Sequence, residues 1–271
     1  MPAADIPITS RGQTKMIKAV FFDIDGTLYS HKAHQIPESA CKALKKLQEQ
    51  GILIFTATGR HMIMIEHLLG DLIPFDGYVS LTGQICLDRQ KHVFYKNPIC
   101  QADTEKIAAF FRTKRRPLTL IEENRRYTNM TDEKVSSSLK NVSSFAPPIE
   151  DYCGGELYQA AGFFTQEDAK ELLSCLDHCK FTSWDEGAID IIPADGGKTV
   201  GIQKLLEHYN LTPDSIMAFG DGDNDVDMLE FAQIGVAMGN ASQKAKAAAD
   251  YITTDIDDHG IAHALKHFHL I

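Results

Sequence analysis

Residues 18–28 read KAVFFDIDGTL, an apolar run that ends in Asp23 and Asp25. Aromatic and branched residues in a run of this length predict a short buried strand. Gly26 predicts a turn directly after it, so both aspartates lie near the carboxyl end of the strand. In open parallel sheets this is the edge where ligands bind, and the two aspartates are therefore candidate functional residues.

Strand and helix patterns alternate on both sides of a central segment. Ala40, Leu44 and Leu47 recur at helical spacing and predict a helix over residues 37–50, which Gly51 ends. This alternation is typical of α/β proteins with a parallel sheet. The other predicted strands are 52–56, 77–80, 215–219, 234–237 and 251–253, and the other predicted helices are 61–69, 199–209 and 226–231.

The central segment, residues 87–190, has a different pattern. It combines helix and strand signals with a Pro-Pro break at 147–148 and a Ser-rich stretch near 136–144, which we expect to be a turn. Alternating runs at 118–121 and 157–164 predict an open sheet with helices.

This difference predicts the division of the chain into domains. We expect residues 87–190 to form an inserted α/β domain, and residues 16–86 and 191–271 to form the core into which it is inserted. Residues 1–15 are expected to be an N-terminal extension that carries no chemistry.

Composition and charge exclude several classes of function. The chain has 271 residues, of which 44% are apolar and 24% charged, and its formal net charge is −10. An acidic chain is a poor candidate for binding nucleic acid or anionic membranes. No apolar run approaches the roughly 18 residues of a membrane helix. Residues 1–15 lack the apolar segment of a secretory signal.

The six cysteines form no CxxC pair. Reduced thiols in a cytoplasmic protein are the expected state for such a set. Cys175 and Cys179 are four residues apart, so we expect them one turn apart on a helix, as small packing groups.

Two further predicted strands end in polar clusters. Thr58 and Gly59 follow the strand at 52–56, and the sequence GDGDND at 220–225 follows the strand at 215–219. Because the carboxyl ends of parallel strands share one edge of a sheet, these clusters can meet the two aspartates of the first strand. Carboxylates gathered at one place repel one another, and a hard divalent cation removes that repulsion. Oxygen ligands without His or Cys favour Mg²⁺ over Zn²⁺.

The pair Asp23 and Asp25 can divide the work of phosphoryl transfer. One carboxylate attacks phosphorus, while the other protonates the leaving oxygen and then activates water. The transfer also needs positive charge and hydrogen-bond donors around the phosphoryl group. Lys198, at a predicted helix N-terminus, supplies the charge. Thr58 and Asn224 supply a hydroxyl and an amide donor.

These residues resemble the motifs of the haloacid dehalogenase superfamily of phosphohydrolases, in the same order along the chain. The motifs are Asp23-Ile-Asp25-Gly-Thr-Leu28, Thr58-Gly59-Arg60, Lys198, and Gly220-Asp221-Gly-Asp-Asn224-Asp225. The forms ATGR and GDGDND, and the large insert between the second and third motifs, are similar to the Cof-type subfamily. Thr82-Gly83 stands where that family often has Asn-Gly, and Lys198-Thr199 where it often has Lys-Gly.

The resemblance implies a Rossmann-like core with an α/β cap, and a Mg²⁺-dependent phosphatase acting on a small phosphorylated metabolite, with sugar phosphates as the leading class. It implies Asp23 as the nucleophile that becomes an aspartyl-phosphate, and Asp25 as the general acid/base. The implied metal ligands are the Asp23 side chain, the Asp25 carbonyl and Asp221, with Asp225 behind them. The phosphate would be held by Thr58, Gly59, Lys198, Asn224 and the backbone after Asp23, at Ile24.

Three other functions stay open on the sequence. A phosphosugar mutase uses the same chemistry but returns the phosphoryl group to a sugar. A non-catalytic phosphometabolite-binding protein binds without turnover, and the pair Asp23 and Asp25 argues against it. A phosphoacceptor signalling domain needs neither Asp25 nor a large insert. Arg60 either contacts the substrate or pairs with an acid on a neighbouring helix.

Overall fold

The computed structural model describes residues 16–70, 72–165, 167, 169–185 and 187–271. It divides into two units between which the chain passes more than once. The first unit comprises the described parts of Met1–Ala57, Asp71–Tyr78 and Ile202–Ile271, and the second comprises Thr58–Gly70 and the described parts of Val79–Gly201. The extension expected at 1–15 lies outside the described residues.

A parallel sheet forms the centre of the first unit, with the strand order β13-β12-β11-β1-β2. Every residue of the strands β1, β11 and β12 is buried, which is why these segments read as unbroken apolar runs. The strands are β1 (Ala19–Phe22), β2 (Leu53–Ala57), β11 (Ile216–Gly220), β12 (Ile234–Ala237) and β13 (Tyr251–Ile252).

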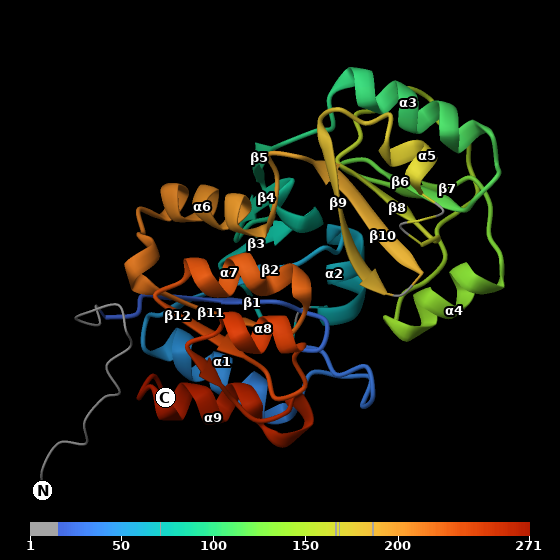
Figure 1. Cartoon of the computed structure of the whole chain (residues 1–271). Coiled ribbons are helices and arrows are strands. Elements are labelled where there is room, and N and C mark those ends of the chain that lie inside the picture. The colour runs from blue at the N-terminus through green and yellow to red at the C-terminus, as the bar shows by residue number, and fades with distance from the viewer. Residues whose placement is uncertain (1–15, 71, 166, 168, 186) are drawn as a thin grey trace, which may run out of the picture. The chain divides into compact units, whose positions relative to one another are not determined.

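Helices connect these strands. The helix α1 (Glu38–Glu49) links β1 to β2, and α7 (Val226–Phe231) links β11 to β12. Because the two links lead in opposite directions across the sheet, right-handed crossovers place α1 and α7 on opposite faces, the arrangement drawn in Figure 1. The helix α9 (Gly260–His267) packs on α1, and α8 (Gln243–Ala248) packs on α7. The helix α6 (Lys198–Tyr209) and the strand β3 (Gly77–Ser80) include residues of both units.

A five-stranded sheet with the order β7-β6-β8-β10-β9 forms the second unit, and its neighbouring strands are antiparallel. These strands are β6 (Leu118–Ile121), β7 (Arg126–Thr128), β8 (Gln159–Gly162), β9 (Cys179–Asp185) and β10 (Ala188–Pro193). The same unit contains the helices α2 (Met62–Leu69), α3 (Gln101–Arg112), α4 (Glu133–Asn141) and α5 (Lys170–Leu173), and the hairpin of β4 (Ile85–Asp88) and β5 (Val93–Lys96).

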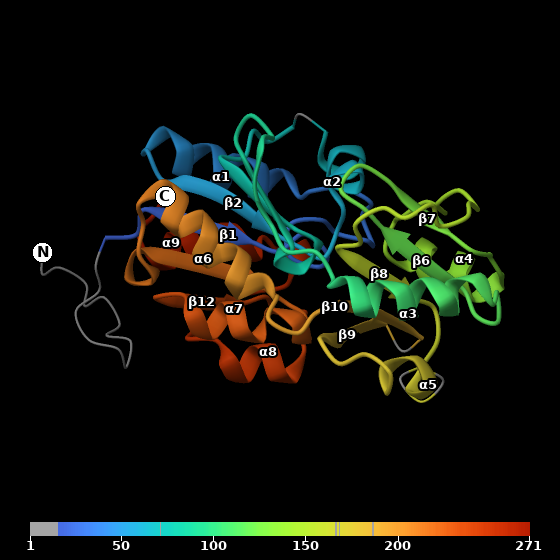
Figure 2. The same cartoon turned by 90° about the horizontal axis from the view of Figure 1, so that it is seen from above.

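The second unit has its own apolar core. Ile107 and Phe111 lie one turn apart on α3 and pack with Leu118 and Leu120 of β6 in one buried cluster. Leu172 of α5 belongs to the same cluster. The helices α3 and α5 accordingly lie side by side in both views, Figure 1 and Figure 2. A core of this kind lets the unit bury apolar surface independently of the first unit.

The turn expected near residues 136–144 is wrong over 136–141, because residues 133–141 form α4, and only residues 142–143 of that stretch are a turn. Asp132 caps this helix by accepting the N–H of Val135 at 2.8 Å. Val135 and Leu139, one turn apart, are buried in a cluster with Phe163. The cap and this burial outweigh the low helix propensity of the three serines.

The helix expected to carry Cys175 and Cys179 is also wrong. The helix α5 ends at Leu173, and Cys179 begins β9, where it lies opposite Pro193. All six cysteines are free. Among the described helices, none is long and apolar enough to cross a membrane.

Candidate active site

Two loops of the first unit meet at the carboxyl ends of β1 and β11. Phe22 lies opposite Phe219 in the parallel register. The N–H of Asp23 then donates to the Phe219 carbonyl at 3.0 Å, which keeps the two chains paired one residue beyond β1. Asp221 follows β11 directly. The sheet register therefore brings Asp23 and Asp221 to one edge, as the parallel-sheet argument predicts.

The carboxylates of Asp23, Asp221 and Asp225 form one acidic cluster. Each offers one oxygen, and these oxygens all lie within 4.8 Å of one another. Asp23 and Asp225 are buried, and Asp221 is half-buried. Three carboxylates this close repel one another in a poorly hydrated place, so a divalent cation bound among them is stabilising. The donors are all oxygen, which fits Mg²⁺.

Asp225 orients the loop after β11. It is 0% exposed, and its Oδ2 accepts the N–H groups of Asp221 and Gly222, each at 2.9 Å. Bonds from backbone N–H groups to a carboxylate are strong, so they fix the direction in which Asp221 leaves the strand. Since the backbone engages one of its oxygens, Asp225 is better suited to orienting Asp221 than to binding the ion itself.

Asp223, in the same loop, has partners at the start of α8. Asp223 accepts from Lys244 Nζ at 2.6 Å and from Ser242 Oγ at 2.7 Å, which fastens the loop to α8. The bond from Lys244, followed by that from Ser242, lowers the pKa of Asp223 below its usual value. Asn224 is half-buried, and its Oδ1 lies over Gly222, where a Cβ would come within 2.4 Å.

The loop after β1 packs tightly against Asp221. Gly26 has a φ of +77°, and a Cβ at this position would lie 2.2 Å from Asp221 Oδ2. Thr27 Oγ1 donates to Asp221 Oδ1 at 2.7 Å, and Asn240 Nδ2 donates to the Gly26 carbonyl at 2.8 Å. The sequence reasoning missed these contacts of Thr27 and Asn240. The only signal for Thr27 was its place next to Gly26 in the first motif.

Backbone bonds close the same loop around Ile24. The Ile24 carbonyl accepts the N–H groups of Leu28 at 3.0 Å and Tyr29 at 2.7 Å. The side chain of Ile24 is 0% exposed, whereas that of Asp25 is 32% exposed. Asp25 is therefore held on a rigid backbone with its carboxylate accessible, which suits a group that exchanges protons.

Thr58 belongs to the second unit, and backbone bonds fix it on both sides. Its N–H donates to the Val79 carbonyl and its own carbonyl accepts the N–H of Thr82, both at 2.9 Å. The Thr58 hydroxyl accepts the N–H of Arg60 at 3.2 Å. A hydroxyl that accepts one bond still carries a hydrogen to donate, for example to a phosphate oxygen.

Lys198 begins α6 and is only 3% exposed, which confirms its predicted place at a helix N-terminus. The residue before it packs against a turn of the same unit, because a Cβ on Gly83 would lie 2.0 Å from the Gly197 carbonyl oxygen. Thr82 of that turn binds the backbone of Thr58. The Thr82-Gly83 turn thus ties the Thr58 loop to the Lys198 loop. A Cβ on Gly59 would lie 3.3 Å from Thr82 Oγ1, so Gly59 joins the same group.

Arg60 and Arg126 are buried in the second unit and bind neighbouring carbonyls. Arg60 is 6% exposed and donates to the Val142 carbonyl, and Arg126 is 8% exposed and donates to the Phe145 carbonyl. The guanidinium of Arg126 also lies 4.4 Å from the centre of the Phe145 ring. Burial, followed by the positive charge of Arg60, lowers the pKa of Arg126 to about 10. Contact between Arg60 and a substrate stays a prediction.

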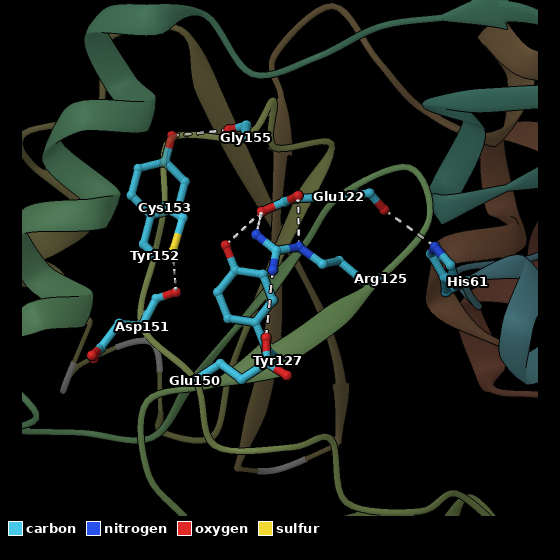
Figure 3. Close-up of polar contacts among 9 residues, drawn as sticks. All are labelled: His61, Glu122, Arg125, Tyr127, Glu150, Asp151, Tyr152, Cys153 and Gly155. Atoms are coloured by element: carbon cyan, nitrogen blue, oxygen red, sulfur yellow. Dashed lines mark hydrogen bonds and ion pairs between the residues drawn. The ribbon is translucent and has the colours of Figure 1, made fainter.

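His61 connects the start of α2 to the turn between β6 and β7 (Figure 3). Its Nδ1 accepts the N–H of Ile63 at 3.2 Å, which caps α2. Its Nε2 lies 3.1 Å from the Glu122 carbonyl and 3.0 Å from the Glu123 carbonyl. These partners assign the hydrogen of the neutral ring to Nε2. Burial lowers the pKa of His61 and outweighs the two carbonyl contacts, which raise it.

The side chain of Glu122 stabilises the same turn. Arg125 donates from Nε and Nη2 to its two oxygens, both at 2.9 Å, and Tyr127 donates its hydroxyl at 2.6 Å (Figure 3). Burial raises the pKa of Glu122, but the bonds from Arg125 and Tyr127 hold it below its usual value. Burial and this bond also raise the pKa of Tyr127. The group is therefore a fixed structural network that keeps its protons in place near neutral pH.

The predicted site residues thus form two groups. Those of the first and fourth motifs lie in the first unit, and those of the second and third motifs lie in the second. The first group is Asp23, Ile24, Asp25, Asp221, Asn224 and Asp225, and the second is Thr58, Gly59, Arg60 and Lys198. Their joint action on one bound phosphate stays a prediction.

The family described as haloacid dehalogenase-like hydrolase matches residues 20–265 of the chain. Among curated proteins, the chain is similar to YkrA of Bacillus subtilis (strain 168), whose name calls it a phosphatase provisionally. The two are 32% identical over 257 residues, which cover 94% of this chain and 98% of YkrA.

Two solved structures resemble the chain over nearly its whole length. One is a sugar phosphatase of haloacid dehalogenase subclass IIB, BT4131, with 37% identity and a TM-score of 0.85 over 94% of this chain and 100% of that one. The other is BT1666 of Bacteroides thetaiotaomicron, a phosphatase of the same superfamily, with 33% identity and a TM-score of 0.85 over 98% of this chain and 100% of that one.

Proposed function

Since the chain belongs to the haloacid dehalogenase-like hydrolases and is a phosphatase of the Cof type, we propose that it hydrolyses phosphomonoesters of small metabolites in the cytoplasm, with Mg²⁺ as cofactor. The observation that carries this proposal is the cluster of Asp23, Asp221 and Asp225 at the ends of two neighbouring parallel strands. The cluster offers a nucleophile and a cation site in the same place.

In the proposed reaction Asp23 is the nucleophile. One of its oxygens attacks phosphorus while the ester oxygen leaves, and Asp25 gives that oxygen a proton. Asp25 then takes a proton from water, which attacks the aspartyl-phosphate and releases inorganic phosphate. Asp25 suits this role because its carboxylate is 32% exposed on a rigid loop. Bound Mg²⁺ supplies positive charge that lets a carboxylate approach a phosphate dianion.

The remaining motif residues would hold the phosphate. Lys198 supplies a buried positive charge, and Thr58 supplies a hydroxyl hydrogen and a fixed backbone. Asn224 supplies an amide, and Gly59 and Ile24 supply backbone N–H groups. Preorganised donors of this kind stabilise the charge that develops on the transferred phosphoryl group.

Residues 87–190 would serve as the cap that selects the substrate. They contain the helices α3, α4 and α5 and most of a five-stranded sheet, with an apolar core of their own. Closure of such a domain excludes water from the first step and fits the leaving group. Sugar phosphates are the substrate class that we propose first, because one similar structure is named as a sugar phosphatase.

The test is release of inorganic phosphate from a panel of sugar, nucleotide, flavin and pyridoxal phosphates, with Mg²⁺ and with a chelator. We expect turnover of at least one sugar phosphate that the chelator abolishes. Asp23→Asn should lower turnover by at least ~10³-fold, since it removes the nucleophile. The matched control is Asp151→Asn, which changes a carboxylate that is 89% exposed and ion-paired only loosely, at 4.0 Å.

Three results would contradict the proposal. Asp23→Asn with most of its activity intact would exclude this nucleophile. Isomerised sugar phosphate without free phosphate would indicate a mutase. Binding of substrates without turnover of any of them would indicate a binding protein.

A further inference from the structure

An imidazole lies against the carboxylate that we assign as the general acid/base. The Nε2 of His31 is 2.8 Å from Oδ1 of Asp25. The side chains are 26% and 32% exposed, but the Nε2 atom itself is shielded from solvent. At this separation the two side chains make a close electrostatic contact.

Two rigid backbone segments aim these side chains at each other. Asp25 sits in the closed loop around Ile24, where it pairs with Tyr29 in an isolated bridge. His31 follows Ser30, whose backbone exchanges bonds with Gln35 at 3.0 and 3.3 Å. The His31 ring also packs on the edge of Tyr29, with the ring centres 5.4 Å apart.

The turn that carries His31 is closed by further bonds. Ser30 Oγ accepts the N–H of Ala33 at 3.0 Å, and His34 adopts a φ of +53°. Because both segments are fixed by their own backbone bonds, the approach of the imidazole to the carboxylate is built into the loop rather than made by two mobile side chains.

A hydrogen on Nε2 would let the ring donate to Oδ1 at this separation, whereas two lone pairs would repel at 2.8 Å. We propose that His31 is a positioning residue for Asp25, which holds the carboxylate in the orientation that delivers its proton to the leaving oxygen. The proposal rests on the proposed function, because it assigns a task only if Asp25 is the acid. It adds a residue that lies outside all four motifs.

The step that His31 would assist is the first one. The bond between phosphorus and the ester oxygen breaks as the Asp23 oxygen bonds to phosphorus, and the proton of Asp25 passes to the ester oxygen, leaving Asp25 as a carboxylate. Correct orientation of an acid matters most when the leaving oxygen is basic, because such an oxygen cannot leave without the proton. An aryloxide leaves readily without it.

The test compares two substrates in wild-type protein and variants. One is p-nitrophenyl phosphate, whose leaving group needs little protonation, and the other is the alkyl phosphate that wild-type protein turns over fastest in the panel above. For His31→Ala we expect kcat on the alkyl phosphate to fall about 10- to 100-fold, a part of the 10²–10⁴-fold that general acids contribute. On p-nitrophenyl phosphate kcat should fall less than about 3-fold, and KM should change little.

Three further variants separate positioning from a merely structural role. His31→Gln places an amide N–H near the position of Nε2 and should restore most of the alkyl phosphatase activity. Lys32→Ala, in the same turn, removes a loose 3.9 Å ion pair with Asp257 and should match wild type on both substrates. In an Asp25→Asn background, His31→Ala should have no further effect, because the acid it positions is gone.

The outcomes also separate this inference from the proposed function. If wild-type protein releases phosphate and Asp25→Asn does not, but His31→Ala behaves as wild type, only the role of His31 is overturned. Equal losses on the two substrates would likewise overturn it. If wild-type protein hydrolyses no alkyl phosphate, the proposed function fails and this inference fails with it.

Discussion

Gly26 shows how a single hydrogen atom permits the acidic cluster. Its φ of +77° turns the chain after Asp25, and the absent Cβ leaves room for the Asp221 carboxylate. Gly51, after α1, has nearly the same φ of +76°, but no atom of the described residues lies within 4 Å of where its Cβ would be. Both positions therefore need a residue that tolerates a positive φ, but only at Gly26 would a Cβ also collide with a neighbouring side chain.

This pair makes a matched experiment at the scale of one residue. Gly51→Ala should cost about 1–2 kcal/mol of unfolding free energy, the strain of a left-handed alanine, and leave turnover unchanged. Gly26→Ala adds the collision with Asp221, so we expect weaker Mg²⁺ binding and at least ~100-fold lower turnover. Urea unfolding, Mg²⁺ titration and phosphate release measure these effects. Equal activity of the two variants would show that the close approach at Gly26 is unimportant.

Thr82 stands where the family often has asparagine, and the backbone at this position explains why asparagine is common there. The residue adopts φ 53° and ψ 38°, a left-handed conformation that asparagine tolerates better than a β-branched side chain. The family's frequent Asn-Gly at this place thus fits the backbone, while Thr82 is strained there. The sequence showed that threonine replaces the usual asparagine, but it did not show that the backbone is left-handed at this position. A φ angle cannot be read from a pattern of side chains.

At the scale of elements, His61 is both the N-cap of α2 and a link to the turn between β6 and β7. Both tasks need the neutral ring, because Nδ1 accepts a bond and only Nε2 carries a hydrogen. Protonation of Nδ1 would place its N–H against the N–H of Ile63 at the cap, where two donors repel each other. The charged groups around the ring are Arg126, which lowers the pKa, and Glu66, which raises it less.

The lowered pKa of His61 predicts a pH-dependent stability. Unfolded His61 has a pKa near 6.5, so the unfolded chain binds this proton before the folded one does. The stabilisation is complete above that pH and is lost as pH falls through the lowered folded pKa, with a slope of at most about 1.4 kcal/mol per pH unit. Urea unfolding of wild type and His61→Gln from about pH 8 to about pH 5 should give a difference that shrinks at low pH.

The control for this prediction is His92→Gln, which changes a histidine that is 79% exposed. Its effect on the free energy of unfolding should be small. If the His61→Gln difference did not shrink at low pH, the neutral ring would have no special place in the fold.

The buried strands were predictable because their residues are apolar almost throughout. The predicted ranges 77–80, 226–231 and 234–237 coincide with β3, α7 and β12. Both wrong predictions, the turn near 136–144 and the helix with Cys175 and Cys179, fall in the second unit. The turn predicted near 136–144 was wrong over 136–141 because the serines hid the N-cap of α4 and its buried pair. The helix predicted for the two cysteines was wrong because α5 has only 4 residues and ends before them.

At the scale of the whole molecule, each unit has its own core, while the proposed cation ligands all lie in the first unit. Mg²⁺ at ~100 times its dissociation constant should therefore stabilise the first unit by about 2.7 kcal/mol. Hydrogen exchange should show slower exchange in β1 and β11 on adding Mg²⁺, with little change in β6 and β8.

Asp221→Asn provides the control for this effect, because it removes one ligand charge while keeping the size of the side chain. We expect it to abolish the difference caused by Mg²⁺. Equal protection of both units, or protection that survives in this variant, would place the cation elsewhere.

The acidic cluster was predictable because neighbouring parallel strands end at the same edge of the sheet. Residues that follow such strands therefore lie close together, even when they are far apart in the sequence. Once β1 and β11 were identified, Asp23 and Asp221 had to meet. The supporting residues were not predictable. Asn240 reaches the Gly26 carbonyl in the first unit, and Thr82 reaches the Thr58 carbonyl in the second. The paths of these loops depend on the packed structure, and no periodicity in the sequence marks such positions.

The contact between Gly83 and the carbonyl of Gly197 links two places far apart in the sequence. One precedes the hairpin of β4 and β5, and the other precedes Lys198. A library of variants at the Thr82-Gly83 turn, made to accept new substrates, would place side chains at Gly83. Each of those side chains would displace the backbone at Gly197 and with it the loop that carries Lys198. Evolution of selectivity in this enzyme would therefore have to work around that glycine and vary its neighbours instead.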